Sequence, residues 1–259
     1  MSHGTVQLEL RENIAVIVLN RPDRLNALTG AMAEDFTVVF ALYPRITQLD
    51  FTGPYEVFWR LPGAECVLAS ASGGDLEADG GITFTRVRRL AEVEHCALIC
   101  VPGGFGTIEA MEDQELLAQI RRLAMSARYV TSVCTGSLVL GAAGLLKGRR
   151  AASHWAWRDA LSAFGATPDP ARVVRDGNVI TGGGVTAGID FALAVMTEIA
   201  GEDYAQSVQL RTEYAPEPPF NSGRPEIAPA HILADTHKFY EPVRRARDAA
   251  VKRAAARLT

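Results

Sequence analysis

The sequence has few of the features that mark membrane, metal-binding or disulfide-stabilised proteins. Only four cysteines occur among its 259 residues, and their spacing matches neither a metal-ligand pattern nor a disulfide framework. No uncharged run approaches the roughly 20 residues that cross a bilayer. The N-terminus also lacks the basic, apolar and small-residue segments of a signal peptide. These absences predict a cytoplasmic, globular protein with reduced cysteines and no metal site.

An excess of one charge is missing as well. The chain has 26 basic and 30 acidic residues and a net charge of −4, so its overall charge predicts neither a nucleic-acid nor a membrane partner. A hydrophobic content of 48% is enough for a full core. The length predicts one or two domains.

The first thirty residues differ from the rest of the chain. Residues 6–10 and 14–19 are predicted to be extended, with a turn between them. This opening, with the loop at residues 20–28, resembles the start of an enoyl-CoA hydratase (crotonase) domain. The resemblance covers only residues 1–31, and the oxyanion hole and acid/base carboxylates of that domain have no counterpart. We therefore predict that residues 1–33 are an N-terminal appendage, and we assign them no function.

Short apolar runs alternate with helical stretches from Phe36 onward. Strands are predicted at residues 36–43, 65–70, 82–87, 96–101 and 129–133, with a turn-rich loop at 73–81. Helices are predicted from residue 48, with Thr52 as a possible cap, and at residues 112–127, 135–146, 155–164 and 182–199. Asp176 and Gly177 mark a hairpin between two further strands. This order predicts an α/β fold, a three-layer sandwich with a mostly parallel, flavodoxin-like sheet.

The end of the chain is first proline-rich and then basic. Residues 215–225 are predicted to be extended, and residues 241–258 to be a helix. That helix carries six basic residues: Arg244, Arg245, Arg247, Lys252, Arg253 and Arg257. A solvated helix face is the simplest interpretation, with nucleic-acid or membrane contact as the alternatives. The predicted domains are therefore an α/β domain at 34–225 and a helical tail at 226–259.

Cys134 is the candidate nucleophile. A β-rich run at residues 129–133 leads to it, and a helix-like run follows Thr135. This pattern predicts a strand, a sharp turn and a helix, the thiol counterpart of a nucleophile elbow. The N–H groups at the start of the helix favour an anion, so we expect a thiolate. The remaining cysteines, Cys66, Cys96 and Cys100, are predicted to be buried thiols, the last two on one face of one strand.

Asp50 and two glycines follow neighbouring strands. Because the carboxyl ends of parallel strands share one edge, Asp50 is expected near Cys134, where it could take a proton or position a water. A helix N-cap is the alternative role for Asp50. Gly103 and Gly104 are predicted to expose backbone N–H groups, as in an oxyanion hole, unless they form only a tight turn.

Thr135 and His154 complete the candidate site. Thr135 adds a hydroxyl group and its own N–H beside the nucleophile. His154 lies after the next strand position, where it is predicted either to partner Cys134 or to form part of the pocket wall.

Several of these stretches carry a family resemblance. Residues 36–225 resemble the ThiJ/PfpI branch of the class I glutamine amidotransferase-like superfamily, and within it the isonitrile hydratases. The supporting stretches are residues 48–56, 99–104, 127–146, 153–155, 181–190 and 214–223. Peptidases of the superfamily place a histidine directly after the nucleophile, whereas this chain has Thr135 there.

The resemblance implies a reaction and a set of catalytic residues. It implies addition of water to an isonitrile to give an N-substituted formamide, through a catalytic trio that falls on Asp50, Cys134 and Thr135. It also implies a small-molecule substrate, no metal or organic cofactor, and a homodimer. Three alternatives remain: a redox-sensing protein, a glyoxalase- or deglycase-like enzyme, and a sensor domain related to AraC-type regulators. Those regulators continue with a DNA-binding region of roughly a hundred residues, whereas about 35 residues follow here.

Overall fold

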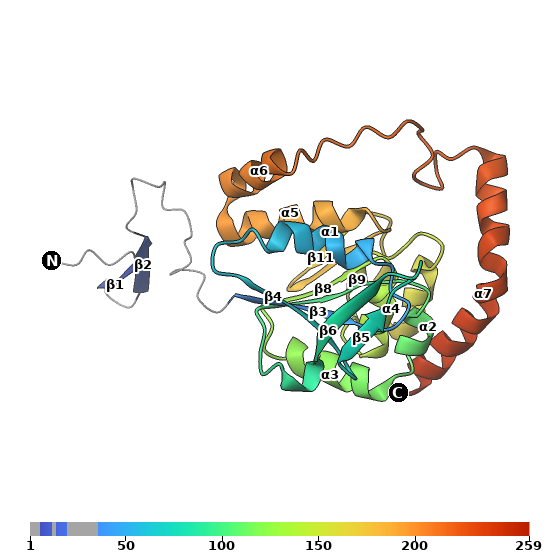
Figure 1. Ribbon diagram of the computed structural model, residues 1–259, viewed down its shortest axis with the longest axis horizontal. Helices are drawn as coiled ribbons and strands as arrows, with labels where there is room; N and C mark the ends of the chain where they lie inside the picture. The colour runs from blue at the N-terminus through green and yellow to red at the C-terminus, as the bar shows by residue number, and fades with distance from the viewer. Residues whose placement is uncertain (1–5, 12–13, 20–35, 259) are drawn as a thin grey trace.

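An eight-stranded sheet lies at the centre of the molecule (Figure 1). The structure, a computed structural model, describes residues 6–11, 14–19 and 36–258. The strand order is β11-β12-β8-β7-β3-β4-β6-β5, and the strands from β12 to β6 are parallel. The sheet strands are β3 Thr37–Leu42, β4 Glu65–Ser70, β5 Gly74–Glu77, β6 Thr83–Arg89, β7 Leu98–Val101, β8 Tyr129–Val133, β11 Val173–Asp176 and β12 Val179–Gly182. The mostly parallel sheet confirms the predicted α/β class.

Helices cover both faces of the sheet. Figure 1 shows α1, α5 and α6 on one side and α3 on the other, and α4 packs against α3. The helices are α1 Leu49–Phe58, α2 Thr107–Ala110, α3 Gln114–Ala124, α4 Gly136–Ala142, α5 Ala187–Ala200, α6 Glu202–Arg211 and α7 Ala230–Ala256. Two 3₁₀ segments, η2 Leu90–Glu92 and η3 Arg158–Phe164, and a short parallel pair, β9 Arg150–Ala151 with β10 Thr167–Pro168, complete this part. The two-sided cover explains why the inner strands are apolar on both faces.

The order of the strands creates the ligand-binding edge. Strand β3 pairs with β4 on one side and with β7 on the other. The chain therefore reverses its direction of winding at β3, and open α/β sheets bind ligands at such a switch point, beyond the carboxyl ends of the strands. Asp50, Gly103 and Cys134 follow β3, β7 and β8, so the fold brings all three to this edge.

Most predicted elements are present, with local corrections. Residues 73–81 are not all loop, because β5 pairs antiparallel with β6. Strand β7 begins at Leu98, so Cys96 lies before it. Residues 158–164 form a 3₁₀ rather than an α-helix. Thr52 lies inside α1 and bonds the Gln48 side chain, so it is not the cap.

Helix α4 is shorter than predicted because a glycine ends it. Gly144 has φ 78°, a left-handed conformation that glycine adopts at little cost. Its N–H donates to Gly141 O at 2.8 Å, and the N–H of Leu145 donates to Leu140 O at 3.0 Å. The helix predicted to reach residue 146 therefore stops at Ala142.

The basic tail is not simply a solvated face. Arg247 donates to Ala156 O at 2.9 Å, and Arg253 pairs with Glu112 at 2.6 Å and 2.8 Å. Arg257 donates to Met111 O at 3.3 Å. Helix α7 begins at Ala230, well before the predicted start, and its second half buries Ala250, Val251 and Ala254 against the body. Three of its basic residues therefore attach the helix to the core.

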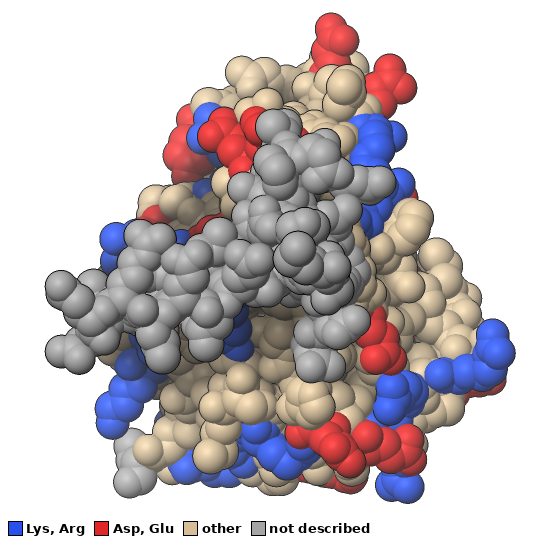
Figure 2. All heavy atoms as spheres, turned by 90° about the vertical axis from the view of Figure 1, so that its left-hand side faces the viewer, with Lys and Arg blue, Asp and Glu red and all other residues tan. Residues whose placement is uncertain are grey.

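The surface carries charges of both signs. On the described part of the face in Figure 2, basic and acidic side chains are interspersed. Within the described ranges, the structure contains no helix that is long and apolar enough to cross a membrane. The N-terminal hairpin pairs β1 Val6–Arg11 with β2 Ile14–Leu19 in antiparallel register, as predicted. The loop at residues 20–28 lies outside the described residues.

Candidate active site

Cys134 occupies a strained turn between β8 and α4. Its φ is 57°, a left-handed value that non-glycine residues rarely adopt. The turn is held because the Cys134 N–H donates to Gly183 O at 2.7 Å and Gly182 O at 3.1 Å. A Cβ at Gly136 would lie 2.0 Å from Val101 O, so only glycine lets α4 begin this close to the end of β7. These features confirm the predicted elbow geometry.

Asp50 lies in the first turn of α1 and is fully buried. Its Oδ2 accepts a hydrogen bond from the Gly103 N–H at 2.8 Å. Its Oδ1 is buried and has no hydrogen-bond partner among the described residues. The carboxylate therefore faces the site with one oxygen fixed and one oxygen available, and it does not cap its helix.

The thiol and the carboxyl group influence each other's protonation. Burial raises the pKa of Asp50 to about 7, although the Gly103 bond and the neighbouring Cys134 thiol lower it. Burial, and then the negative charge of Asp50, raise the pKa of Cys134 well above its usual value, and the N–H of Thr135 offsets this only in part. The carboxyl group therefore ionises first, and the resting pair is a thiol beside a carboxylate. The expected thiolate is wrong for this state, because burial outweighs the helix terminus.

The amides of Gly103 and Gly104 hold the side chains of Asp50 and Thr135. The Gly103 N–H is used by Asp50, and the Gly104 N–H donates to Thr135 Oγ1 at 3.0 Å. A Cβ at Gly103 would lie 2.5 Å from Thr135 N and 2.8 Å from Asp50 Oδ2, so glycine is required there. Because both amides already donate, the geometry gives them a positioning task. Their predicted oxyanion role stays a prediction.

A chain of three hydroxyl groups leads away from the site. Tyr43 donates to Pro102 O at 2.6 Å and lies 3.0 Å from Thr107 Oγ1, which in turn lies 2.7 Å from Thr135 Oγ1. Each hydroxyl group has one proton. Since the proton of Tyr43 is used on Pro102, the hydroxyl group of Thr107 is the donor to Tyr43. The Thr135 hydroxyl group then has two acceptors, Thr107 Oγ1 at 2.7 Å and Gly104 O at 3.4 Å. These bonds hold Thr135 beside Cys134, where its backbone N–H and then its side chain lower the pKa of the thiol.

His154 lies beside the elbow, and the contacts of its ring in the described structure do not include the sulfur. Its Nδ1 accepts the Ala156 N–H at 3.3 Å, and its ring lies near Trp155 and Tyr240, at centroid distances of 5.6 Å and 5.7 Å. Burial lowers the pKa of His154 to about 4, so the ring is neutral near pH 7. Of the two predicted roles, this geometry favours the pocket wall.

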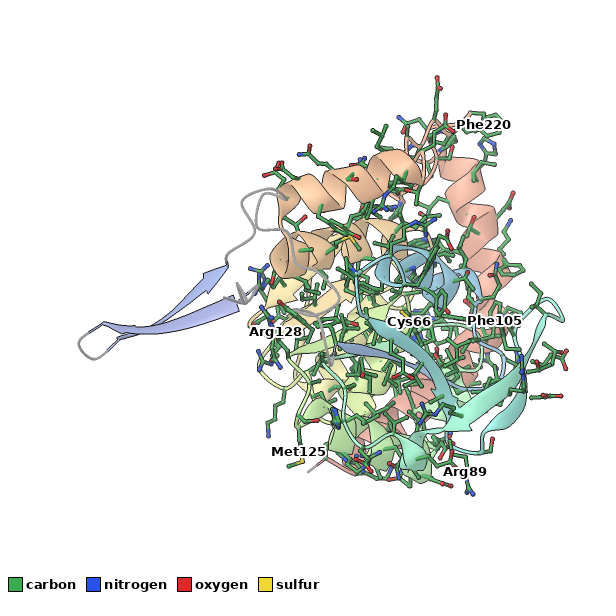
Figure 3. All side chains as sticks on the ribbon, turned by 60° about the vertical axis from the view of Figure 1, so that its left-hand side comes forward. Cys66, Arg89, Phe105, Met125, Arg128 and Phe220 are labelled. Atoms are coloured by element: carbon green, nitrogen blue, oxygen red, sulfur yellow. The ribbon has the colours of Figure 1, made fainter. Side chains whose placement is uncertain are left out.

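The other cysteines lack the setting of Cys134. All four lie in the described part of the chain and are free thiols. Burial raises the pKa of Cys66, Cys96 and Cys100 to about 12 each. Cys66, labelled in Figure 3, comes from β4 and is only partly buried. The predicted burial is confirmed for Cys96 and Cys100 and is wrong for Cys66.

Sequence reasoning missed Tyr43, Thr107 and Tyr240. Tyr43 directly follows β3 and Thr107 begins α2, so both lie at strand ends of the same edge as Asp50. Their place just after strands that end at this edge could have marked them as candidate site residues. Tyr240 lies on α7, whose path over the site no local pattern reveals.

The site combines a cysteine at a strained strand-to-helix turn with a buried carboxylate. Both lie at the switch point of a parallel sheet. This combination defines a class of α/β proteins with a nucleophile elbow. The chain belongs to the DJ-1/PfpI family, whose model matches residues 36–198.

Relatives of several kinds share this fold. The chain is 49% identical over 219 residues to an isonitrile hydratase of Pseudomonas putida, which covers 85% of this chain and 96% of that protein. The crystal structure of a ThiJ/PfpI family protein from Pseudomonas syringae superposes with a TM-score of 0.81, at 42% identity, over 84% of this chain and 90% of that one. The HTH-type transcriptional regulator CdhR of Pseudomonas aeruginosa is 33% identical over 144 residues, covering 54% of this chain and 42% of the regulator.

Proposed function

We propose that this protein is an isonitrile hydratase, which adds water to an isonitrile and releases an N-substituted formamide. The observation that carries the proposal is the buried, unpartnered Oδ1 of Asp50 beside the Cys134 thiol. Hydration of an isonitrile transfers a proton when the thiol adds to the carbon and again when water adds. Both transfers need a base next to the nucleophile. The high identity to the Pseudomonas putida isonitrile hydratase supports the same reaction.

The first step joins the thiol to the isonitrile carbon. Asp50 takes the proton from Cys134, the sulfur bonds to the terminal carbon of R–N≡C, and the proton then passes from Asp50 to that carbon. The product is a thioimidate, R–N=CH–S–Cys134, and Asp50 is again a carboxylate. This order suits a resting thiol, because proton removal and attack occur together.

The second step uses the same carboxylate on water. Asp50 takes a proton from water, the oxygen bonds to the thioimidate carbon, and the nitrogen receives the proton. Collapse of R–NH–CH(OH)–S–Cys134 forms the carbonyl, breaks the C–S bond and returns the proton to sulfur through Asp50. The net change is one water added to one isonitrile.

The surrounding groups hold this pair in place. Gly103 fixes Oδ2 of Asp50 and Gly104 fixes Thr135, so both residues are held beside Cys134. In this scheme the backbone N–H of Thr135 stabilises charge on the sulfur as the thiol leaves. No step requires a metal or an organic cofactor.

The test is product formation in water labelled with oxygen-18. Purified protein is incubated with cyclohexyl isocyanide, and the product is followed by NMR and mass spectrometry. We expect N-cyclohexylformamide with the label in its carbonyl group. If no formamide forms above the rate in heat-inactivated protein, the proposed function is wrong.

The geometry bears on one rival. Oxidation of a sensor cysteine requires an accessible, low-pKa thiolate, whereas Cys134 is buried and its pKa is raised. This observation disfavours redox sensing. The homodimer and the cytoplasmic location stay predictions, and light scattering of the purified protein measures the first.

A further inference from the structure

Helix α7 lies close to the site, although it follows the residues that the family model matches. The ring of Tyr240 on α7 contacts the ring of His154 at 5.7 Å and that of Trp155 at 6.1 Å, both edge-on. His237, one turn earlier on the helix, meets Trp155 at 5.2 Å. Together these rings pack residues 154–155 against α7.

Two sets of contacts fix these rings near the thiol. On the elbow side, Ser153 donates to Cys134 O at 3.1 Å. Gly184 follows Gly183, whose carbonyl oxygen accepts from the Cys134 N–H, and a Cβ at Gly184 would lie 3.2 Å from the His154 ring. Burial, and then the charge of an ionised Cys134, raise the pKa of Tyr240, so the tyrosine and the sulfur lie near each other. The rings are therefore neighbours of the nucleophile.

On the helix side, an arginine ties α7 to the same segment. Arg247 donates to Ala156 O at 2.9 Å, and its guanidinium group lies 5.4 Å from the centre of the Trp157 ring. The helix is thus attached two residues beyond His154. A helix held this way presents Tyr240 in one position, as a specificity surface needs.

The wall formed by His154, Trp155 and Tyr240, here called the aromatic wall, is uncharged near neutral pH. His154 is neutral because burial lowers its pKa to about 4, and burial raises the pKa of Tyr240. On the outer side of the wall, Trp155, His237 and Tyr240 also line a cavity of about 440 Å³ together with Asp159 and charged side chains of α7, and this cavity does not include Asp50 or Cys134. The uncharged ring faces of the wall, rather than this cavity, suit a compact hydrocarbon group.

We propose that the aromatic wall receives the hydrocarbon substituent of the isonitrile, so that the enzyme selects ring-sized apolar isonitriles over methyl or charged ones. This inference rests on the proposed function for its substrate, but it concerns residues that the chemistry itself does not use. The wall positions the substrate, while Cys134 and Asp50 act on the isonitrile carbon.

The test compares cyclohexyl and methyl isocyanide in three variants. Tyr240→Ala is expected to raise KM for cyclohexyl isocyanide about tenfold, with little change for methyl isocyanide, because apolar pocket contacts discriminate by about that factor. Tyr240→Phe keeps the ring and should stay within about twofold of the wild type. Phe220→Ala is the control, since Phe220 is 78% exposed and projects from the segment before α7 (Figure 3).

A second arm does not depend on isonitrile turnover. Cys134 is alkylated with N-cyclohexylmaleimide and N-methylmaleimide, and each rate is measured at the Cys134 peptide by mass spectrometry. We expect the wild type to favour the cyclohexyl reagent and Tyr240→Ala to lose that preference. If this occurs while no isonitrile is hydrated, the aromatic wall stands and the proposed function fails.

Equal effects on both substrates would overturn the inference. If Tyr240→Ala lowers kcat for cyclohexyl and methyl isocyanide alike, or leaves the ratio of the two alkylation rates unchanged, Tyr240 is only structural. Circular dichroism of Tyr240→Ala and Tyr240→Phe shows whether α7 is retained in both.

Discussion

The two sides of the site are built in different ways. The polar floor, made of Asp50, Gly103, Cys134 and Thr135, comes from the ends of sheet strands and lies inside the residues that the family model matches. The aromatic wall takes Tyr240 from α7, outside that range, and its rings are partly exposed. The floor is suited to fix the chemistry, whereas the wall is suited to choose the substrate. Changes in the floor should therefore lower kcat for every isonitrile, and changes in the wall should act through KM according to substrate size.

The largest effect short of removing the nucleophile is expected for Asp50→Asn. Without a base, kcat should fall about 100- to 10,000-fold for cyclohexyl and methyl isocyanide alike. Asp79→Asn is the matched control, since the Asp79 carboxylate also accepts a backbone bond, from Phe105 N–H at 3.0 Å. Steady-state kinetics measure both, and a size-dependent loss in Asp50→Asn would break the division between floor and wall.

A methyl group at Gly103 is the next largest change. In Gly103→Ala the new carbon would clash with Thr135 N and Oγ1 and with Asp50 Oδ2, so the backbone at Thr135 and both side chains must move. We expect kcat to fall roughly 100-fold, because small misplacements in a site cost about that much. Gly223→Ala, where no atom lies within 4 Å of a Cβ, should be silent. Near-normal kcat in Gly103→Ala would show that the floor does not depend on this packing.

The pH dependence separates the floor from the wall in another way. Because the Asp50 pKa is about 7 and the base must be ionised, kcat/KM should rise as pH increases through about 7. Asp50→Asn should lose this inflection, whereas Tyr240→Phe should keep it. A flat wild-type profile between pH 5 and about 8 would contradict the assignment of Asp50 as the base.

The same pKa has a consequence for stability. A carboxyl group whose folded pKa is raised binds more protons in the folded than in the unfolded state between pH 3.8 and about 7, so the free energy of unfolding falls as pH rises through that window. The loss is at most about 4 kcal/mol, from roughly three pKa units. Asp50→Asn should therefore be more stable than the wild type at about pH 8 and lose that advantage near pH 4. Urea unfolding at both pH values measures it, and an unchanged difference would show that Asp50 is not buried in this way.

The smallest expected effect belongs to the hydroxyl chain. Thr107→Val removes the hydroxyl group that lies 2.7 Å from Thr135 Oγ1, so Thr135 is held less firmly and kcat should fall about three- to tenfold, the cost of one hydrogen bond. Thr107→Ser should restore it. Thr131→Val is the control, because it removes a buried hydroxyl that bonds Ile99 O instead. If Thr107→Val and Thr131→Val lower kcat equally, Thr107 has only a packing role.

The same contrast explains what the sequence could predict. The strands, the elbow at Cys134 and the placement of Asp50 follow from apolar runs, turn residues and the rule that parallel strands share an edge. The resting thiol did not follow, because its pKa depends on burial that no local pattern reports. The use of the Gly103 and Gly104 amides also needed coordinates, since either amide could have stayed open. Tyr240 reaches the site through more than a hundred residues of intervening chain, and only tertiary packing places it there.

The central claim is that Cys134, rather than any other thiol, carries the hydration of isonitriles. The most direct measurement is formamide production from cyclohexyl isocyanide by the wild type, Cys134→Ala and the control Cys66→Ala, followed by NMR under identical conditions. We expect wild type and Cys66→Ala to be equally active and Cys134→Ala to show no formamide above background. Full activity in Cys134→Ala would contradict the account.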